Sequence, residues 1–220
     1  MDTKLAPELQ IEWLGRGLEY GEMLHRQEAL VAERVADPVH VPERLLLLEH
    51  APVYTIGRTP DRSSLLDPAQ LPHPLFTIGR GGQATYHGPG QLVGYPIFLL
   101  RQEERDLHLY LRNLEEALIR TVGRFGIPGE RKEAWTGVWT AGGARKLASI
   151  GVAVKRWVTL HGFALNVSTE LARFGAINPC GLEATIMGSM ETALGRGVSF
   201  AEVKAVARDE LGAVFARQLS

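Results

Sequence analysis

The single cysteine of the chain lies in an irregular stretch that is suited to nucleophilic catalysis. Cys180 follows Asn178 and Pro179 and precedes Gly181, so the thiol is expected on a turn rather than on the packed face of a helix or strand. A thiol with its unperturbed pKa of about 8.5 is already partly thiolate at neutral pH, and modest activation makes it a nucleophile. Buried cysteines are more often inert apolar groups, and the residue alone leaves both interpretations open.

A lysine beside a glycine-rich turn is the second candidate. Lys146 follows Gly142 and Gly143 and enters an apolar strand, in a chain with five lysines against nineteen arginines. A functional lysine here acts as a point charge or, if desolvated, as a base with a lowered pKa. A solvated charge at the end of a strand is the alternative.

The densest signal is the segment 79–91, which holds five glycines within twelve residues. Backbone without Cβ atoms can approach a ligand closely, and Arg80, Gln83 and His87 place polar groups beside that gap. The segment lacks the Gly-Lys-Ser/Thr of a phosphate-binding P-loop and the spacing of a dinucleotide fingerprint. A β-hairpin with a tight turn at Gly88-Pro89-Gly90 is the alternative interpretation.

His161 closes a β-rich run and is followed by Gly162, which again permits a close approach. A satisfied structural histidine is the alternative. No pair of histidines has metal-ligand spacing, so we expect no metal site. Five other histidines have no informative surroundings: His25, His40, His50, His73 and His108.

The elements that must hold these segments follow from the hydrophobic pattern. It predicts helices over residues 18–35, 106–126 and from 199 onward, and strands over 45–48, 53–56, 76–100, 135–140 and 146–167. Asp106 is expected to cap the second helix, and Ser199 with Glu202 to form a capping box for the last. Residues 58–74 are typical of a long surface loop. The order of elements indicates an α+β fold, a mixed β-sheet flanked by helices, in one domain over residues 1–220, although the last helix could sit on a small appended lobe.

Composition excludes several classes of protein. The apolar fraction of 45% and the charged fraction of 22% are those of a globular protein, and the net charge of -1 gives no basic surplus for nucleic acid. No apolar run is long enough to span a bilayer, and the first residues do not resemble a signal peptide. One cysteine cannot form an internal disulfide. These features predict a soluble cytoplasmic protein, and nothing in the sequence demands more than a monomer.

Four segments, in the same order, resemble the octanoyl-acyl carrier protein:protein octanoyltransferases, the lipoate biosynthesis protein B family. They are Arg80-Gly-Gly-Gln-x-Thr-Tyr-His87-Gly-Pro-Gly-Gln91, Lys146-Leu-Ala, His161-Gly-x-Ala-Leu-Asn166 and Asn178-Pro-Cys-Gly181. The resemblance runs over residues 45–190. Gly188-Ser189 stands where many members read Thr-Ser, a departure that bears on packing near the thiol rather than on the chemistry.

The resemblance implies a fold and an activity. The fold is the catalytic domain shared by biotin and lipoate protein ligases. The activity moves octanoyl from octanoyl-acyl carrier protein to a lysine on the lipoyl domains of 2-oxoacid dehydrogenase complexes or on the glycine cleavage carrier protein. Transfer from a thioester to an amide runs downhill, so neither a nucleotide nor another cofactor is needed.

The resemblance also implies roles for residues. Cys180 is the nucleophile that forms an acyl thioester, and Lys146 lowers the thiol pKa and serves as acid and base. The implied acyl site comprises Arg80, Gly81, Gly82, Gln83, Ala84, Thr85, Tyr86, His87, Ser149, Ile150, Gly151, His161, Gly162, Phe163 and Ala164.

Two other functions compete with this one. An ATP-dependent lipoate–protein ligase has similar glycine-rich and lysine segments but needs no thiol, so Cys180 favours the transferase. A non-catalytic module that binds lipoyl domains or an acyl chain would need neither Cys180 nor Lys146.

Overall fold

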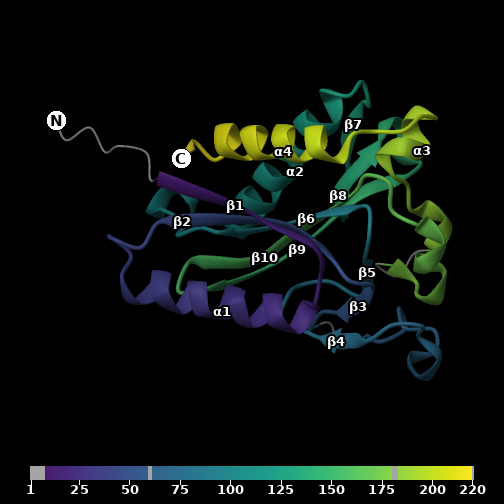
Figure 1. Ribbon diagram of the computed structural model, residues 1–220, viewed down its shortest axis with the longest axis horizontal. Helices are drawn as coiled ribbons and strands as arrows, with labels where there is room; N and C mark the ends of the chain where they lie inside the picture. The colour runs from purple at the N-terminus through teal and green to yellow at the C-terminus, as the bar shows by residue number, and fades with distance from the viewer. Residues whose placement is uncertain (1–7, 59–60, 180–182, 220) are drawn as a thin grey trace.

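The computed structural model describes residues 8–58, 61–179 and 183–219. Within these ranges an eight-stranded mixed sheet forms the middle layer of the fold (Figure 1). Two neighbouring pairs of strands at one edge of this sheet are parallel, and the other neighbouring pairs of strands are antiparallel. The strands, in their order across the sheet, are β11 (Gln218–Leu219), β1 (Glu8–Leu18), β2 (Glu43–His50), β6 (Gln91–Ile97), β10 (Val158–Asn166), β9 (Lys146–Lys155), β8 (Trp135–Thr140) and β7 (Gly129–Lys132).

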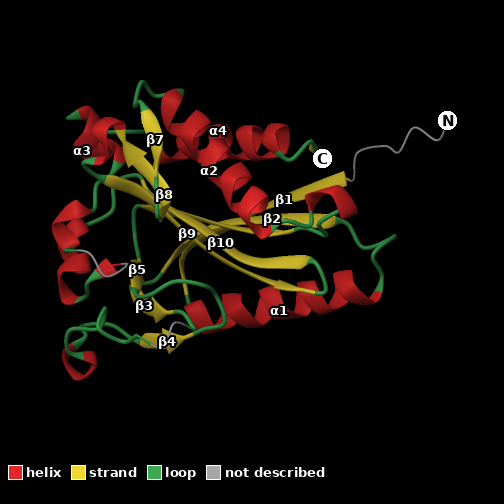
Figure 2. Cartoon of the chain, turned by 180° about the vertical axis from the view of Figure 1, so that it is seen from behind, coloured by secondary structure: helices red, strands yellow, loops and turns green. Residues whose placement is uncertain are grey.

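Helices cover both faces of this sheet, as Figures 1 and 2 show from opposite sides. Helix α1 (Tyr20–Ala36) covers one face, and α2 (Leu107–Gly123) and α4 (Phe200–Val214) cover the other. The predicted mixed sheet flanked by helices is therefore confirmed. The short helical elements are η1 (Pro68–Gln70), η2 (Gln102–Glu104), η3 (Ala141–Gly143), η4 (Leu171–Ala176), η6 (Ala184–Ile186) and α3 (Met190–Leu194).

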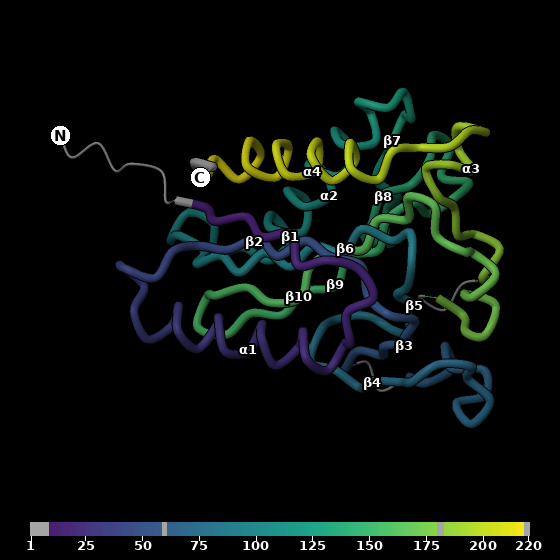
Figure 3. Tube along the Cα trace, in the orientation of Figure 1, coloured from purple at the N-terminus to yellow at the C-terminus, as the bar shows by residue number. Residues whose placement is uncertain are grey.

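A second, three-stranded sheet lies near the start of α1 (Figure 3). Its order is β4 (Leu75–Thr77), β3 (Val53–Ile56) and β5 (Thr85–His87). Strand β5 pairs with β3, whereas β6 pairs with β2 and β10 in the large sheet. The hairpin interpretation of the glycine-rich segment is therefore wrong, because the turn at Gly88-Pro89-Gly90 carries the chain from one sheet to the other. A Cβ at Gly90 would lie 2.7 Å from Ser168, which explains the glycine there.

The main core lies between the large sheet and the α2–α4 layer. Asp106 caps α2 as predicted, since its carboxylate accepts the backbone N–H groups of His108 and Leu109. Leu118 of α2 and Leu211 of α4 belong to one buried cluster with residues of the sheet. The last helix is thus part of the main core, and the expectation of an appended lobe is wrong. In the described part of the chain, no helix combines the length and apolar character needed to cross a bilayer.

Strand β1 was not predicted from the sequence. Its pairing with β2 shifts register at Gly15, and both Gly15 and Gly17 have positive φ angles. Glu12 on this strand forms an ion pair with Arg44 of β2 at 2.7 Å. Glycines and charges thus interrupt the alternation by which a strand is recognised.

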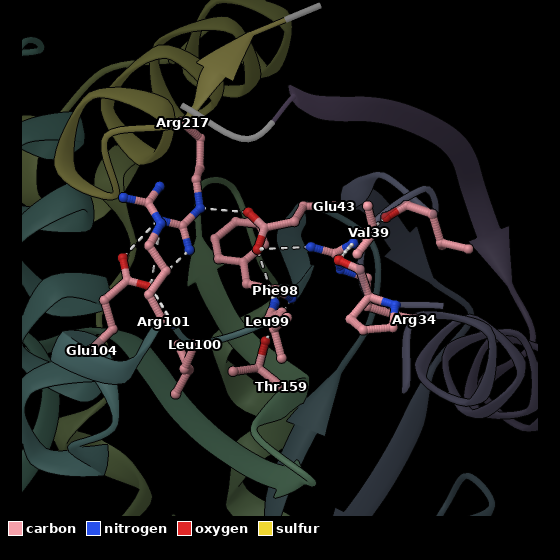
Figure 4. A network of polar contacts seen from close by, with 12 residues as sticks. Arg34, Val39, Glu43, Phe98, Leu99, Leu100, Arg101, Glu104, Thr159 and Arg217 are labelled. Atoms are coloured by element: carbon pink, nitrogen blue, oxygen red, sulfur yellow. Dashed lines mark hydrogen bonds and ion pairs between the residues drawn. The ribbon is translucent and has the colours of Figure 1, made fainter. Parts of the chain in front are cut away.

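A buried network of charges ties the segment after α4 to the large sheet (Figure 4). The Arg217 side chain is 0% exposed and contacts the carboxylates of Glu43 and Glu104, the latter at 2.7 Å. Glu43 also accepts the backbone N–H of Leu99 at 2.9 Å, and Arg34 of α1 lies 3.9 Å from it. Burial raises the pKa of the Glu43 carboxyl, and the Arg217 charge opposes that shift.

We expect Arg217→Ala to lower the free energy of unfolding by about 3–5 kcal/mol, because it leaves the Glu43 carboxylate buried without its main counter-charge. Urea unfolding at pH 7 measures the change. Arg208→Ala is the matched control: Arg208 pairs with Asp209 at the surface, and its loss should cost less than about 1 kcal/mol. Equal losses in the two variants would show that the network does not stabilise the fold.

Candidate active site

A β-bulge in β9 sets the direction of the Lys146 side chain. Val138 of β8 pairs with Ala148 and Trp139 with Lys146, so one step on β8 matches two steps on β9. Leu147 and Ala148 both belong to the core cluster under α2, which consecutive residues of a regular strand cannot do. The bulge therefore turns Lys146 to the opposite face, where its Nζ lies 5.5 Å from the centroid of the Trp139 ring. Lys146 is only 2% exposed, so the interpretation as a solvated strand-end charge is wrong.

A cavity of about 60 Å³ lies on that same face of the sheet, near the start of α1. All of the predicted acyl-site residues line it except Gly81 and Tyr86. Gly81 lines an adjoining hollow instead. The Tyr86 ring packs against Tyr54 and Phe174, with centroids 5.4 and 5.5 Å away. The cavity thus gathers three segments that are far apart in the sequence.

The loop 79–84 closes the cavity against the large sheet. The Gly81 N–H donates to the carbonyl of Val152 on β9 at 3.2 Å. The buried Arg80 guanidinium donates to Thr55 Oγ1 at 2.9 Å and to the Gly81 carbonyl at 2.9 Å. These two acceptors, which do not themselves line the cavity, fix the position of the Arg80 guanidinium.

Hydrogen bonds fix the protonation of His87, which lines the cavity. Gln91 Nε2 donates to the Tyr86 carbonyl at 3.1 Å and to Asn166 Oδ1 at 2.9 Å, so Gln91 Oε1 is an acceptor. His87 Nδ1 lies 2.8 Å from that oxygen and therefore carries the proton. The other ring nitrogen, Nε2, is left with a lone pair.

The same chain of hydrogen bonds continues to the backbone of Lys146. Asn166 Nδ2 donates to the Gly188 carbonyl at 2.9 Å, and the Gly188 N–H donates to the Lys146 carbonyl at 2.9 Å. The side chains of His87, Gln91 and Asn166 are all buried. The cavity wall and the backbone of the lysine are thereby joined through buried, hydrogen-bonded polar groups.

Histidines around the cavity are neutral at physiological pH. Burial lowers the pKa of His87 to about 3, with a further contribution from His50. Burial also lowers the pKa of His50 and of His161 to about 4, and the Arg80 charge contributes at His161. Arg80 is therefore the charged side chain among the lining residues, beside uncharged imidazoles, neutral polar groups and apolar groups.

Three residues at or near the cavity were not predicted from the sequence: Tyr20, Tyr95 and His50. Tyr20 and Tyr95 line the cavity. His50 Nδ1 donates to the Leu18 carbonyl at 3.0 Å, so His50 Nε2 accepts the Tyr95 hydroxyl proton at 2.6 Å. The Tyr20 ring lies 5.0 Å from the His50 ring. The position of His50 at the end of a buried strand could have identified it as a candidate, whereas no neighbouring residues distinguish the two tyrosines.

His161 combines a cavity position with an unusual backbone. Its φ of 59° lies in the left-handed region inside strand β10. The fully buried Gln27 of α1 accepts its backbone N–H at 2.9 Å. Gln27 was also missed, and its bond holds the backbone of His161 rather than the imidazole, whose Nδ1 is buried without a hydrogen-bond partner among the described residues.

Cys180 lies outside the described residues. On either side of the undescribed segment, Ile177 forms a bridge with Leu65, and Met187 forms a parallel bridge with Lys146. The chain that follows the segment thus runs beside the candidate base.

The comparisons with known proteins agree on one family. Residues 19–212 match the lipoyl protein ligase A/B catalytic domain. The chain is 52% identical over 196 residues to an octanoyltransferase of Geobacter metallireducens, covering 89% of this chain and 88% of that protein. It is 48% identical over 193 residues to an octanoyltransferase of Gloeobacter violaceus, covering 87% and 84%.

Solved structures share the fold at low sequence identity. A putative lipoate protein ligase from Thermoplasma acidophilum superposes with a TM-score of 0.71 at 14% identity, covering 97% of this chain and 87% of that one. A biotin protein ligase from Aquifex aeolicus superposes with a TM-score of 0.55 at 16% identity, covering 94% and 70%. The predicted likeness to the biotin and lipoate protein ligase fold is confirmed.

Acid should destabilise the fold through its neutral histidines. An unfolded histidine has a pKa of about 6.5, so the folded chain binds fewer protons, and stability present above about pH 6.5 is lost as pH falls toward 4. In His50→Gln this decline should be smaller, by up to about 3 kcal/mol between pH 7 and 4. Urea unfolding across that range measures it.

His108→Gln, which removes an exposed histidine of α2, is the control and should keep the wild-type slope. An unchanged slope in His50→Gln would show that His50 titrates in the folded state much as it does in the unfolded chain.

Proposed function

This chain belongs to the lipoyl protein ligase A/B catalytic-domain family, and from that premise we propose that it transfers octanoyl from octanoyl-acyl carrier protein to a lysine of lipoyl domains. It is an acyltransferase, as its octanoyltransferase relatives are. The acceptors in this proposal are lipoyl domains of 2-oxoacid dehydrogenase complexes and the glycine cleavage carrier protein. The non-catalytic alternative is thereby set aside.

In the first half-reaction of this proposal, the Cys180 thiolate attacks the carbonyl carbon of the donor thioester. A new carbon–sulfur bond forms to Cys180, the bond to the carrier's sulfur breaks, and the carrier thiolate takes a proton from the Lys146 ammonium. The enzyme is left as an octanoyl thioester with a neutral lysine beside it.

In the second half-reaction, the ε-amine of the acceptor lysine attacks the same carbonyl carbon. A carbon–nitrogen bond forms, the Cys180 thiolate leaves, and neutral Lys146 takes the proton that the amine releases. Each half-reaction returns Lys146 to the charge that the other one needs, so two protein substrates can use one site in turn.

The observation that carries the proposal is the placement of Lys146. A lysine amine that is buried on the same face of the sheet as the cavity, and turned there by a bulge, is suited to proton transfer. The backbone carbonyl of Lys146 is joined to His87 through the chain of hydrogen bonds described above. A lysine that served only solubility would be exposed at a strand end.

The character of the cavity also supports an acyl ligand. Its histidines are neutral, and the guanidinium of its arginine, Arg80, donates to Thr55 and to the Gly81 carbonyl. Apart from Arg80, no charged side chain is among the described residues that line the cavity. We assign the acyl chain to this cavity, with its carbonyl end toward Lys146.

Intact-protein mass spectrometry tests the covalent step. Mixing the chain with octanoyl-acyl carrier protein without ATP should add one octanoyl group, which a lipoyl domain then removes. Cys180→Ala should show neither the adduct nor transfer, while keeping the wild-type thermal unfolding temperature. If no adduct forms but ATP plus free octanoate or lipoate modifies the lipoyl domain, the chain is a ligase and the thiol is structural.

Loss of the candidate base should slow transfer without unfolding the chain. Lys146→Ala is expected to reduce the transfer rate at pH 7 by at least about 100-fold, the scale of general acid–base catalysis. Lys155→Ala, at the exposed far end of the same strand, is the matched control and should transfer at the wild-type rate. Near-wild-type turnover by Lys146→Ala at pH 7 would remove Lys146 from the mechanism.

A further inference from the structure

We propose that Gly137 and Glu115 are positioning residues that hold the Lys146 amine in place. Neither residue lines the cavity, and neither belongs to the segments that resemble the octanoyltransferases. The inference rests on the proposed function, because it assigns a task to residues that act only through Lys146.

Gly137 leaves the space that the lysine side chain fills. A Cβ at Gly137 would lie 2.7 Å from Lys146 Cε, 3.4 Å from Lys146 Nζ and 2.3 Å from the Ala148 carbonyl oxygen. The backbone of Gly137 also has a φ of 137°, which favours glycine. The Ala148 carbonyl belongs to strand β9, so a side chain at Gly137 must displace either the strand or the amine end of Lys146.

Trp139 forms the other wall of the same site. Its buried ring lies 5.5 Å from Lys146 Nζ and 4.6 Å from Nζ of Lys132. The indole Nε1 donates to the Trp135 carbonyl at 3.3 Å, which holds the ring against β8. The lysine side chain is thus confined between two residues of one strand, Gly137 and Trp139.

Glu115 fixes the Gly137 wall from the opposite face of the sheet. This α2 residue is 0% exposed, and its Oε1 accepts the Gly137 N–H at 3.0 Å. Its Oε2 lies 2.6 Å from Arg112 and 3.2 Å from Arg131, so the carboxylate is oriented by two guanidinium groups. A helix on the core side thereby sets the backbone against which the amine rests.

The expected consequence is electrostatic. The charge of the Lys146 ammonium favours the thiolate of its partner, and that effect falls with distance. A displaced amine should therefore leave the thiol with a pKa closer to the unperturbed value of about 8.5. General loss of stability would not produce that shift.

The chain's single cysteine makes the shift measurable. The rate of iodoacetamide alkylation, followed by intact-protein mass against pH, gives the thiol pKa of the full-length chain. We expect a value well below 8.5 in the wild type and about 8.5 in Lys146→Ala. Gly137→Ala and Glu115→Ala should move toward the Lys146→Ala value, and octanoyl transfer should fall by at least about tenfold.

Two variants serve as controls. Glu115→Gln keeps an amide oxygen that can accept the Gly137 N–H, so it should retain the wild-type thiol pKa. Gly123→Ala makes the same glycine change on α2 where an added Cβ meets no atom within 4 Å, so it should match the wild type in both thiol pKa and transfer.

The outcomes separate the two proposals. A wild-type thiol pKa in Lys146→Ala would overturn the proposed cysteine–lysine pair itself. A shift in Lys146→Ala with wild-type behaviour in Gly137→Ala would overturn only the positioning role. If Gly137→Ala does not fold, the two Glu115 variants decide. A shift of the thiol pKa in Glu115→Ala that is absent in Glu115→Gln supports the positioning role. A wild-type thiol pKa in Glu115→Ala overturns it.

Discussion

The buried chain of hydrogen bonds from His87 to the backbone of Lys146 is the constraint on which the candidate site depends. Its links come from the small sheet, the large sheet and the segment before α3, and the side chains of Gln91 and Asn166 are hydrogen-bonded at both their oxygen and their nitrogen. An unmade bond among buried groups is costly, so the three parts of the chain are held in one arrangement. The orientation of the amide of Gln91 and the tautomer of His87 both follow from this requirement.

Charged groups are distributed unevenly around this chain of hydrogen bonds. At the cavity, burial keeps three histidines neutral, and the Arg80 guanidinium donates to neutral acceptors. Full ion pairs are placed elsewhere, in the Arg217 network and around Glu115. The fold thus uses paired charges to fix its backbone, whereas Arg80 is the charged side chain among the residues that line the cavity.

Local sequence patterns correctly predicted the elements whose formation depends on residues close together in the sequence. Strands β3 and β8 were predicted with their observed bounds, since each is a short β-rich run, and the Asp106 cap depends on residues two and three positions away. The glycine-rich segment was recognisable because a close backbone approach requires glycine. The bulge at Leu147 was not, since Lys146-Leu147-Ala148 could equally belong to a regular strand.

Features that depend on contacts between residues far apart in the sequence could not be predicted from the sequence. Tyr20 and His50 meet only after α1 has folded onto the sheet, and α4 reveals its place in the main core only through its contact with α2. Gly137 carries no sign of its role, because that role is defined by a lysine on the neighbouring strand.

The contact between Trp139 and Lys146 gives the molecule an optical property. The Trp139 ring lies 5.5 Å from the Lys146 amine and 4.6 Å from that of Lys132, so it experiences the electric field of both charges. Its excited state is more polar than its ground state, so the colour of its emission depends on whether the neighbouring nitrogen carries a proton. The fold therefore holds an intrinsic fluorophore beside a group whose charge would alternate during turnover.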